Sequence, residues 1–330
     1  MDNTYYILSK DNLTIERFHF CTWDISKKPY IEFGVELTDN CFQNKNELIL
    51  YFTNTFFNKG IVVKCLMENL SDEANCRFIF NDVVKSMRPL DGDKRNGNIY
   101  EFESRNKLTI IPCEVECKEG YFIIKIKKPC EIDGNIYFRF LIQLDVKHIS
   151  EVKKSITKKN HIYDVKVNEN RNIPNSVFLL KKEEGLYLCK ISRMFCLHTI
   201  PDIYEINFVA SSVLKNIRKL ETDSFKKYIP SVESINNNNS NIIFLKSENT
   251  ESYSFFTILT EESISSVQLA FAVATNILCS LLFAISSIRY VREPNLSWWK
   301  QIPCECYIAG SLFLLLVIYL LTPLKKKLKL

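Results

Sequence analysis

The sequence lacks the glycine-rich motifs that hold phosphate groups in the common nucleotide-binding folds. Its 330 residues include only eight glycines, and no two of them are adjacent. No P-loop, Rossmann fingerprint or serine-hydrolase nucleophile elbow occurs, so the protein classes built on those motifs are excluded. Nucleotide binding by other means stays open.

The sequence also has little of what catalysis usually requires. It has four histidines, none of which stands in a recognisable nucleophile or zinc-protease motif. We therefore expect no catalytic residue, no cofactor and no enzymatic activity, and an enzyme built on a cysteine–histidine pair has no motif to support it. The histidines are His19, His148, His161 and His198.

Metal-binding patterns are incomplete. Cys113 and Cys117 alternate with glutamates, which favours two core thiols on one strand face over a metal site. Cys189, Cys196 and His198 are close in sequence, but a second pair of ligands with zinc spacing is missing. His19 and Cys21 are a weaker pair still. We expect no metal.

The chain has no strong excess of charge. Its 43 Lys and Arg stand against 38 Asp and Glu, a net charge of +5. Residues 1–260 account for only +2 of that charge, and no concentrated basic stripe occurs outside residues 215–227. A nucleic-acid-binding function is therefore not expected.

Two long apolar runs are present near the C-terminus. The first, Val267–Ile288, has 22 residues without a charge, which as a helix spans roughly 33 Å. The second, Tyr307–Leu324, is followed by a cluster of lysines, and Trp298 and Trp299 lie between the two runs. A pair of buried core helices is the alternative. The pattern favours two transmembrane helices.

The position of these runs predicts the topology. Residues 1–18 contain no apolar signal-peptide core, so we expect residues 1–260 to stay on the side of synthesis. Two crossings then return the lysine tail to that side, in agreement with the positive-inside rule. The protein is expected in the cell (inner) membrane, with both termini in the cytosol and its cysteines reduced.

Alternating apolar residues dominate the soluble part. The longest example is Ile136–Val146, and similar short runs recur between about residues 31 and 209. Turn pairs such as Asn96-Gly97 and Asp133-Gly134 separate several of them. Many short strands without long helices between them predict a mainly β fold, an antiparallel sandwich or barrel.

Changes in composition divide the chain into four parts. We expect a first β-rich unit at 1–150 and a second β unit at 160–230, joined by the lysine-rich segment 151–160. Helical spacing of Val213, Ile217, Leu220 and Tyr228 predicts an amphipathic helix at the end of the second unit. An Asn-rich linker, 231–259, and a transmembrane hairpin, 260–330, complete the chain.

Small and polar residues recur every four positions in the first apolar run. Ala272, Asn276, Ser280 and Ala284 share one helix face, which permits close helix packing, and the Asn276 amide needs a hydrogen-bond partner in lipid. The stripe has three interpretations: packing against the second apolar helix, homo-oligomerisation, and lining of a water-filled pore.

The architecture suggests a function although no family signature is present. We expect a non-enzymatic sensor or effector in the lipid bilayer, whose cytosolic β domain binds a ligand or protein partner and whose hairpins oligomerise to perturb the membrane. Bacterial anti-phage effectors have this general layout, which is an analogy of architecture only. The alternatives are a membrane-tethered accessory or scaffold subunit of a larger complex and, with less support, a membrane-bound hydrolase.

Overall fold

The chain divides into two compact units, which are Met1–Lys154 with Lys159–Glu261, and Ser155–Lys158 with Glu262–Leu330. The computed structural model describes residues 4–24, 29–42, 45–54, 57, 61–144, 149–155, 158–220, 228, 240–262, 266–289 and 302–328.

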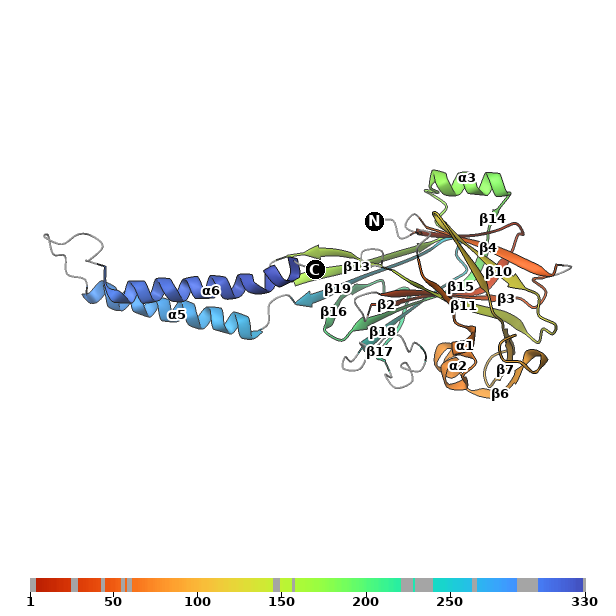
Figure 1. The fold of residues 1–330 in the computed structure, drawn as a ribbon, viewed down its shortest axis with the longest axis horizontal. Coiled ribbons are helices and arrows are strands. Elements are labelled where there is room, and N and C mark those ends of the chain that lie inside the picture. Colours follow the sequence, from red (N-terminus) through yellow and green to blue (C-terminus); the bar gives the residue numbers. More distant parts are fainter. Residues whose placement is uncertain are drawn as a thin grey trace. The chain divides into compact units, whose positions relative to one another are not determined.

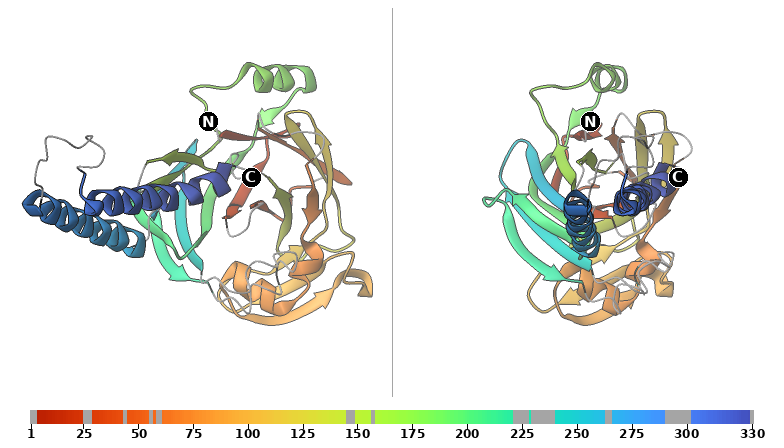
Figure 2. Two further views of the ribbon diagram at one scale, coloured as in Figure 1. Left: turned by 60° about the vertical axis from the view of Figure 1, so that its left-hand side comes forward. Right: turned by 90° about the vertical axis from the view of Figure 1, so that its left-hand side faces the viewer.

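The first unit is mainly β, as predicted, and consists of two sheets (Figures 1 and 2). The first sheet has nine strands. Its continuous path is β16 (Tyr204–Val209), β19 (Tyr253–Glu262), β13 (Lys158–Val167), β1 (Thr4–Ser9), β4 (Glu47–Thr53), β10 (Tyr121–Lys127) and β9 (Glu114–Lys118), with β12 (Glu151–Lys154) beside β13 and β14 (Tyr187–Leu188) beside β1.

The second sheet has ten strands. Its path is β17 (Leu214–Lys219), β18 (Ser240–Glu248), β15 (Lys190–Pro201), β2 (Thr14–Trp23), β3 (Tyr30–Leu37), β11 (Asn135–Gln143), β8 (Leu108–Ile110), β7 (Asn98–Phe102) and β6 (Val84–Pro89), with β5 (Val63–Cys65) beside β11.

Both sheets are mixed, whereas the sequence predicted antiparallel architecture. The pairs β1–β13, β2–β15 and β8–β11 run parallel. The reason is that β1 and β2, although consecutive in the chain, enter different sheets, and each lies beside a strand from residues 158–201. Parallel neighbours need long crossovers rather than hairpins, and short-range turn patterns do not reveal such crossovers.

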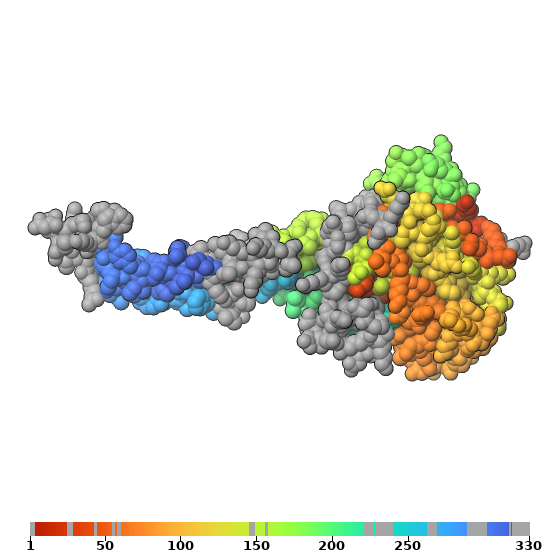
Figure 3. Space-filling view, in the orientation of Figure 1, coloured from red at the N-terminus to blue at the C-terminus, as the bar shows by residue number. Residues whose placement is uncertain are grey.

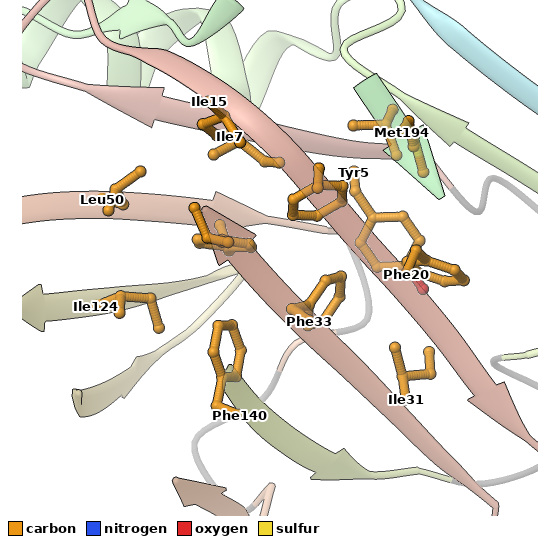
Figure 4. Packing of buried hydrophobic residues seen from close by; sticks show 14 of the residues in the cluster. Tyr5, Ile7, Ile15, Phe20, Ile31, Phe33, Leu50, Ile124, Phe140 and Met194 are labelled. Atoms are coloured by element: carbon orange, nitrogen blue, oxygen red, sulfur yellow. The ribbon is translucent and has the colours of Figure 1, made fainter. Parts of the chain in front are cut away.

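The two sheets share one hydrophobic core between their inner faces. Alternate residues of β2 and β3, among them Phe20 and Phe33, point into it, and so does Phe140 of β11 (Figure 4). The Phe33 ring centroid lies 5.3 Å from that of Phe140 and 5.4 Å from that of Phe52 on β4. Because one aromatic cluster joins strands from both sheets, the sheets form a sandwich.

The predicted division into two β units at 1–150 and 160–230 is wrong. β1 pairs with β13 and β2 with β15, so the N-terminal strands lie within both sheets beside strands from residues 158–201. Backbone hydrogen bonds therefore connect strands that precede the lysine-rich segment 151–160 with strands that follow it. One unit therefore contains both predicted units.

The predicted linker, 231–259, contains the strand β18 and most of the strand β19. β18 pairs antiparallel with β15 over nine residues, and β19 lies between β13 and β16 in the first sheet. Asn-rich composition suggested a loop, but Ile243 and Leu245 of β18 are fully buried in the core. Residues 231–239 lie outside the described residues.

The predicted amphipathic helix is wrong over Leu214–Lys219, whereas Tyr228, the last residue of the predicted pattern, is helical. Residues Leu214–Lys219 form β17, an edge strand that pairs with β18, while residues 221–227 lie outside the described residues. The spacing of apolar residues in this segment fits a helix, but pairing with β18 provides backbone partners that periodicity alone cannot anticipate.

The first unit also contains short helices that the sequence did not predict. α1 (Met67–Leu70) and α2 (Glu73–Phe80) lie beside β6 and β7 (Figures 1 and 2), and α3 (Asn175–Glu184) lies on the surface (Figure 3). Asp72 caps the N-terminus of α2, because its carboxylate accepts a 2.8 Å hydrogen bond from the Ala74 amide, and Asn81, with φ of +50°, caps the C-terminus.

The second unit contains two helices, α5 (Ser266–Arg289) and α6 (Cys304–Leu328), which pack against each other. Among the described residues one segment, Leu269–Ile288, is long and apolar enough to span a membrane. The apolar segment of α6, Cys304–Leu316, is shorter. The second predicted span is therefore not confirmed. Trp298 and Trp299 lie outside the described residues.

Candidate functional site

The four-residue stripe on α5 lies mostly beside, and not within, the contact with α6. Asn276, Ser280 and Ala284 are exposed, and only Ala272 is partly covered. The residues of α5 that are covered lie about a quarter turn around the helix. They are Ala272, Thr275, Cys279, Leu282 and Ser286.

The α5–α6 contact is made by small side chains. Cys279 Sγ lies 3.6 Å from the carbonyl oxygen of Ala309, and Ala309 is 1% exposed. Ser280 donates a 2.9 Å hydrogen bond to the Asn276 carbonyl within the helix, so its hydroxyl is internally satisfied. The Asn276 side chain is exposed on the surface of the hairpin. Packing against α6 therefore does not account for the stripe beyond Ala272.

A pocket of about 270 Å³ lies on the outer face of the second sheet, on the side away from the sandwich core. Outward residues of β2 form its floor, the end of α2 forms one wall, and β17 and β18 form another. The five cationic residues that line it are Arg17, Arg105, Arg139, Lys215 and Arg218. The aromatic residues that line it are Trp23, Phe78, Phe80, Phe195 and Phe244.

The floor of the pocket rests on a buried ion pair between β3 and β11. Arg139 and Glu32 have side chains 1% and 0% exposed. Arg139 donates to Glu32 Oε2 through Nε at 2.9 Å and also through Nη2, and the Tyr228 hydroxyl donates to the same oxygen at 3.2 Å. Burial raises the pKa of Glu32, and the Arg139 guanidinium opposes that rise.

A hydrogen-bond chain continues from this pair to His19. Arg139 Nη1 donates to the Tyr137 hydroxyl at 2.9 Å, so that hydroxyl gives its hydrogen to His19 Nδ1, also 2.9 Å away. This arrangement requires a neutral His19 with its proton on Nε2. Burial and the neighbouring Arg139 both lower the pKa of His19 well below its ordinary value, which agrees with the neutral form.

Gly34 leaves room for this chain. A Cβ atom at position 34 would lie 2.1 Å from the Tyr137 hydroxyl oxygen and 2.9 Å from the ring carbon that carries it. Side chains stand on the outer face of β3 at Glu32 and Glu36, two residues away in each direction. The glycine is required here by close approach of a neighbouring side chain.

We expect Gly34→Ala to lower the free energy of unfolding by about 1–3 kcal/mol, because the added methyl group displaces Tyr137 from its hydrogen bonds. Urea denaturation measures this loss. In the double variant with Tyr137→Phe, the second change removes the clashing oxygen, so the two substitutions should cost less together than their separate sum. Strictly additive losses would contradict the steric explanation.

A second charged cluster at the pocket consists of Glu36, Arg105 and Arg17. Glu36 accepts hydrogen bonds from Arg105 Nη2 at 2.7 Å and from Asn135 at 2.8 Å, and Arg17 Nε lies 3.5 Å from it. The Arg105 guanidinium also lies over the Phe80 ring, 4.7 Å from the centroid. Burial and the positive charge of Arg105 lower the pKa of Arg17.

His19 and Cys21, a weak metal candidate from sequence, both line this pocket. Burial raises the pKa of Cys21 to about 11, so its sulfur is a protonated thiol at neutral pH. His19 is neutral, and its Nδ1 accepts a hydrogen bond from the Tyr137 hydroxyl. Neither residue has the properties of an activated nucleophile in this arrangement.

The remaining sequence candidates lie in the core. Cys113 is buried, and its Sγ lies 3.8 Å from that of Cys65, while Cys117 packs against the core from a half-buried position. Cys196 Sγ lies 3.5 Å from His198 Nε2 in the sandwich interior. Among the described residues no cluster of three His, Cys, Asp or Glu is arranged to hold a metal ion.

The comparisons with known proteins do not identify the chain. No protein-family model matches it, and no curated protein is significantly similar to it.

Sequence reasoning missed the pocket as a site. A partial signal was present in β2, where Arg17, His19, Cys21 and Trp23 alternate with Phe18 and Phe20 on the other side of the strand. The other contributors come from α2, β11, β15, β17, β18 and the loop that holds Arg105, and neither α2 nor β17 was predicted. The assembly of cations from four distant segments is a property of the fold.

Proposed function

We propose that this protein is a non-enzymatic sensor or effector of the cell membrane. Its cytosolic β unit binds a ligand in the pocket of the second sheet, and its α5–α6 hairpins span the bilayer with both termini in the cytosol and associate into homo-oligomers that perturb the membrane. The observation that carries this proposal is the exposure of Asn276, Ser280 and Ala284 on α5, outside the contact with α6.

The Asn276 amide lies within an apolar helix. A primary amide in hydrocarbon needs hydrogen-bond partners, and small neighbours allow another helix to approach closely. Since α6 packs on a different face of α5, the partner that satisfies the amide is a helix from another chain. A second copy of the same hairpin presents the same stripe, which is the requirement of a symmetric interface.

We expect Asn276→Leu combined with Ser280→Leu to abolish or weaken oligomerisation. The interhelical hydrogen bond of the Asn276 amide contributes on the order of 1 kcal/mol, and the bulky leucine side chains block close approach. Cross-linking in membranes measures oligomer size, and dye leakage from vesicles measures permeability. Ala274→Leu is a matched control, because residue 274 is exposed on a different face of α5.

The accessory-subunit alternative gives a different result in the same experiment. A subunit would use the stripe to bind a helix of another protein, so the double variant would lose that partner while the wild-type protein alone caused no leakage. Unchanged oligomer size and unchanged leakage in the double variant would contradict the proposed role of the stripe.

A further inference from the structure

Arg105 provides unused hydrogen-bond donors at the pocket. Its side chain is 9% exposed and makes one hydrogen bond to Glu36 through Nη2. Within the described part of the chain, its buried Nε and Nη1 have no hydrogen-bond partner. The buried Nε of Arg17 has no hydrogen-bond partner either, although it lies 3.5 Å from Glu36 in an ion pair. Buried donors without acceptors are costly, so this arrangement suits an external acceptor that enters the pocket.

The charge of the lining specifies an anion. All five charged residues that line the pocket are cationic. Two carboxylates, Glu32 and Glu36, pair with these cations, so the positive charges outnumber the negative ones. Lys215 and Arg218 lie at the pocket on the edge strand β17. A concave site lined with cations concentrates anions, and planar guanidinium groups favour phosphate oxygens through paired hydrogen bonds.

The aromatic lining specifies a planar group beside the anion. The rings of Phe195 and Phe244 are nearly parallel, with an interplanar angle of 6° and centroids 5.9 Å apart. The Arg17 guanidinium lies 5.8 Å from the centroid of Phe195. Flat apolar surfaces next to guanidinium groups suit an aromatic ring that carries a phosphate.

The size of the pocket limits the ligand. Its volume of about 270 Å³ lies just below the common range for small-molecule sites, roughly 300–1,000 Å³. One base with one sugar phosphate fits this size better than a dinucleotide does. Because the chain has no glycine-rich phosphate loop, side-chain guanidinium groups would take the place of backbone amides.

We propose that this pocket binds a nucleoside monophosphate. The phosphate accepts hydrogen bonds from Arg105 and Arg17, and the base lies against the aromatic wall that includes Phe195. This inference deepens the proposed function by naming the ligand class of the β unit.

Titration calorimetry on the full chain in detergent tests the inference with AMP, GMP, CMP and UMP. Inorganic phosphate and adenosine supply the two halves of the ligand separately. We expect at least one monophosphate to bind, and both halves to bind at least about tenfold more weakly. Phosphate that binds as tightly as the nucleotide would overturn the role of the ring, and adenosine that does so would overturn the role of the anion.

Variants assign the binding to the pocket. Arg105→Gln should weaken nucleotide binding by about tenfold to a hundredfold, because it removes a charge-assisted donor pair. Arg88→Gln is the matched control, since Arg88 is half exposed and pairs with Glu131 away from the pocket. Lys215→Ala with Arg218→Ala tests the electrostatic contribution at exposed positions and should also weaken binding.

Thermal unfolding of each variant separates loss of binding from loss of folding. If Arg105→Gln does not fold, the Lys215 and Arg218 variants decide the result, because both residues are exposed. Failure of all four nucleotides to bind the folded wild-type protein at millimolar concentration would overturn the inference. Intact nucleotide binding without oligomerisation would contradict the proposed function and leave this inference standing, so the two failures are distinguishable.

Discussion

Glu32→Ala is expected to lower the free energy of unfolding by about 3–5 kcal/mol, the largest effect of any substitution considered for this protein. The Arg139 guanidinium would stay buried at 1% exposure without its carboxylate partner. Two guanidinium donors and the Tyr228 hydroxyl would lose their shared acceptor at the same time. Equilibrium denaturation with urea, followed by circular dichroism, measures the loss.

Two controls identify burial as the cause. Glu131→Ala removes the partner of Arg88, an ion pair of which both side chains are about half exposed, and should cost less than about 1 kcal/mol. Glu32→Leu combined with Arg139→Met removes both charges and should be less destabilising than Glu32→Ala alone. Equal losses for the exposed and buried pairs would contradict the structural explanation.

The stability of the β unit is expected to fall as the pH drops below about 6.5, and His198 is expected to contribute about 3 kcal/mol of that loss. Burial lowers the pKa of His198 to about 4. Between these two values the unfolded chain binds a proton that the folded protein excludes, so acid favours unfolding. The neutral imidazole is held in place by a 2.7 Å hydrogen bond between Nδ1 and the Thr22 hydroxyl.

His198→Gln provides the comparison, because its amide retains polar atoms but does not titrate in this range. Unfolding free energies of both proteins at several pH values between 7 and 4 give two curves, and their slopes should differ by the contribution of one proton. His19, whose pKa burial also lowers, gives both proteins the same additional slope. Identical curves would show that His198 is not buried in its neutral form.

The sequence predicted strands well where apolar alternation was local. β11 and β3 were recognised because one face of each strand is apolar along its length. The opposite face of β11 carries Tyr137 and Arg139, and both are buried, which alternation of apolar residues does not predict. Polar residues on the second face are compatible with burial because Glu32 and His19 provide partners from neighbouring strands.

The candidate site was harder to predict, for a related reason. Arg105 lies in the loop between β7 and β8, and nothing in its sequence context marks it as buried. Its environment comes from Glu36 on β3 and Phe80 on α2, which are 69 and 25 positions away in the chain. A pocket assembled by long-range pairing leaves no short motif, so motif searches pass over it.

The amino-acid sequence predicts the mainly β character of the first unit and the long apolar helix that contains Leu269–Ile288, because side-chain periodicity and an uncharged run are local properties. It also determined that glycine-rich phosphate loops are absent. The fold, by contrast, establishes that β17 and β18 are strands, that β1 and β2 enter different sheets, and that cationic side chains lie together near Glu32 and Glu36. These features depend on hydrogen bonds and charge pairs between distant segments, and such partners exist only after the chain has folded.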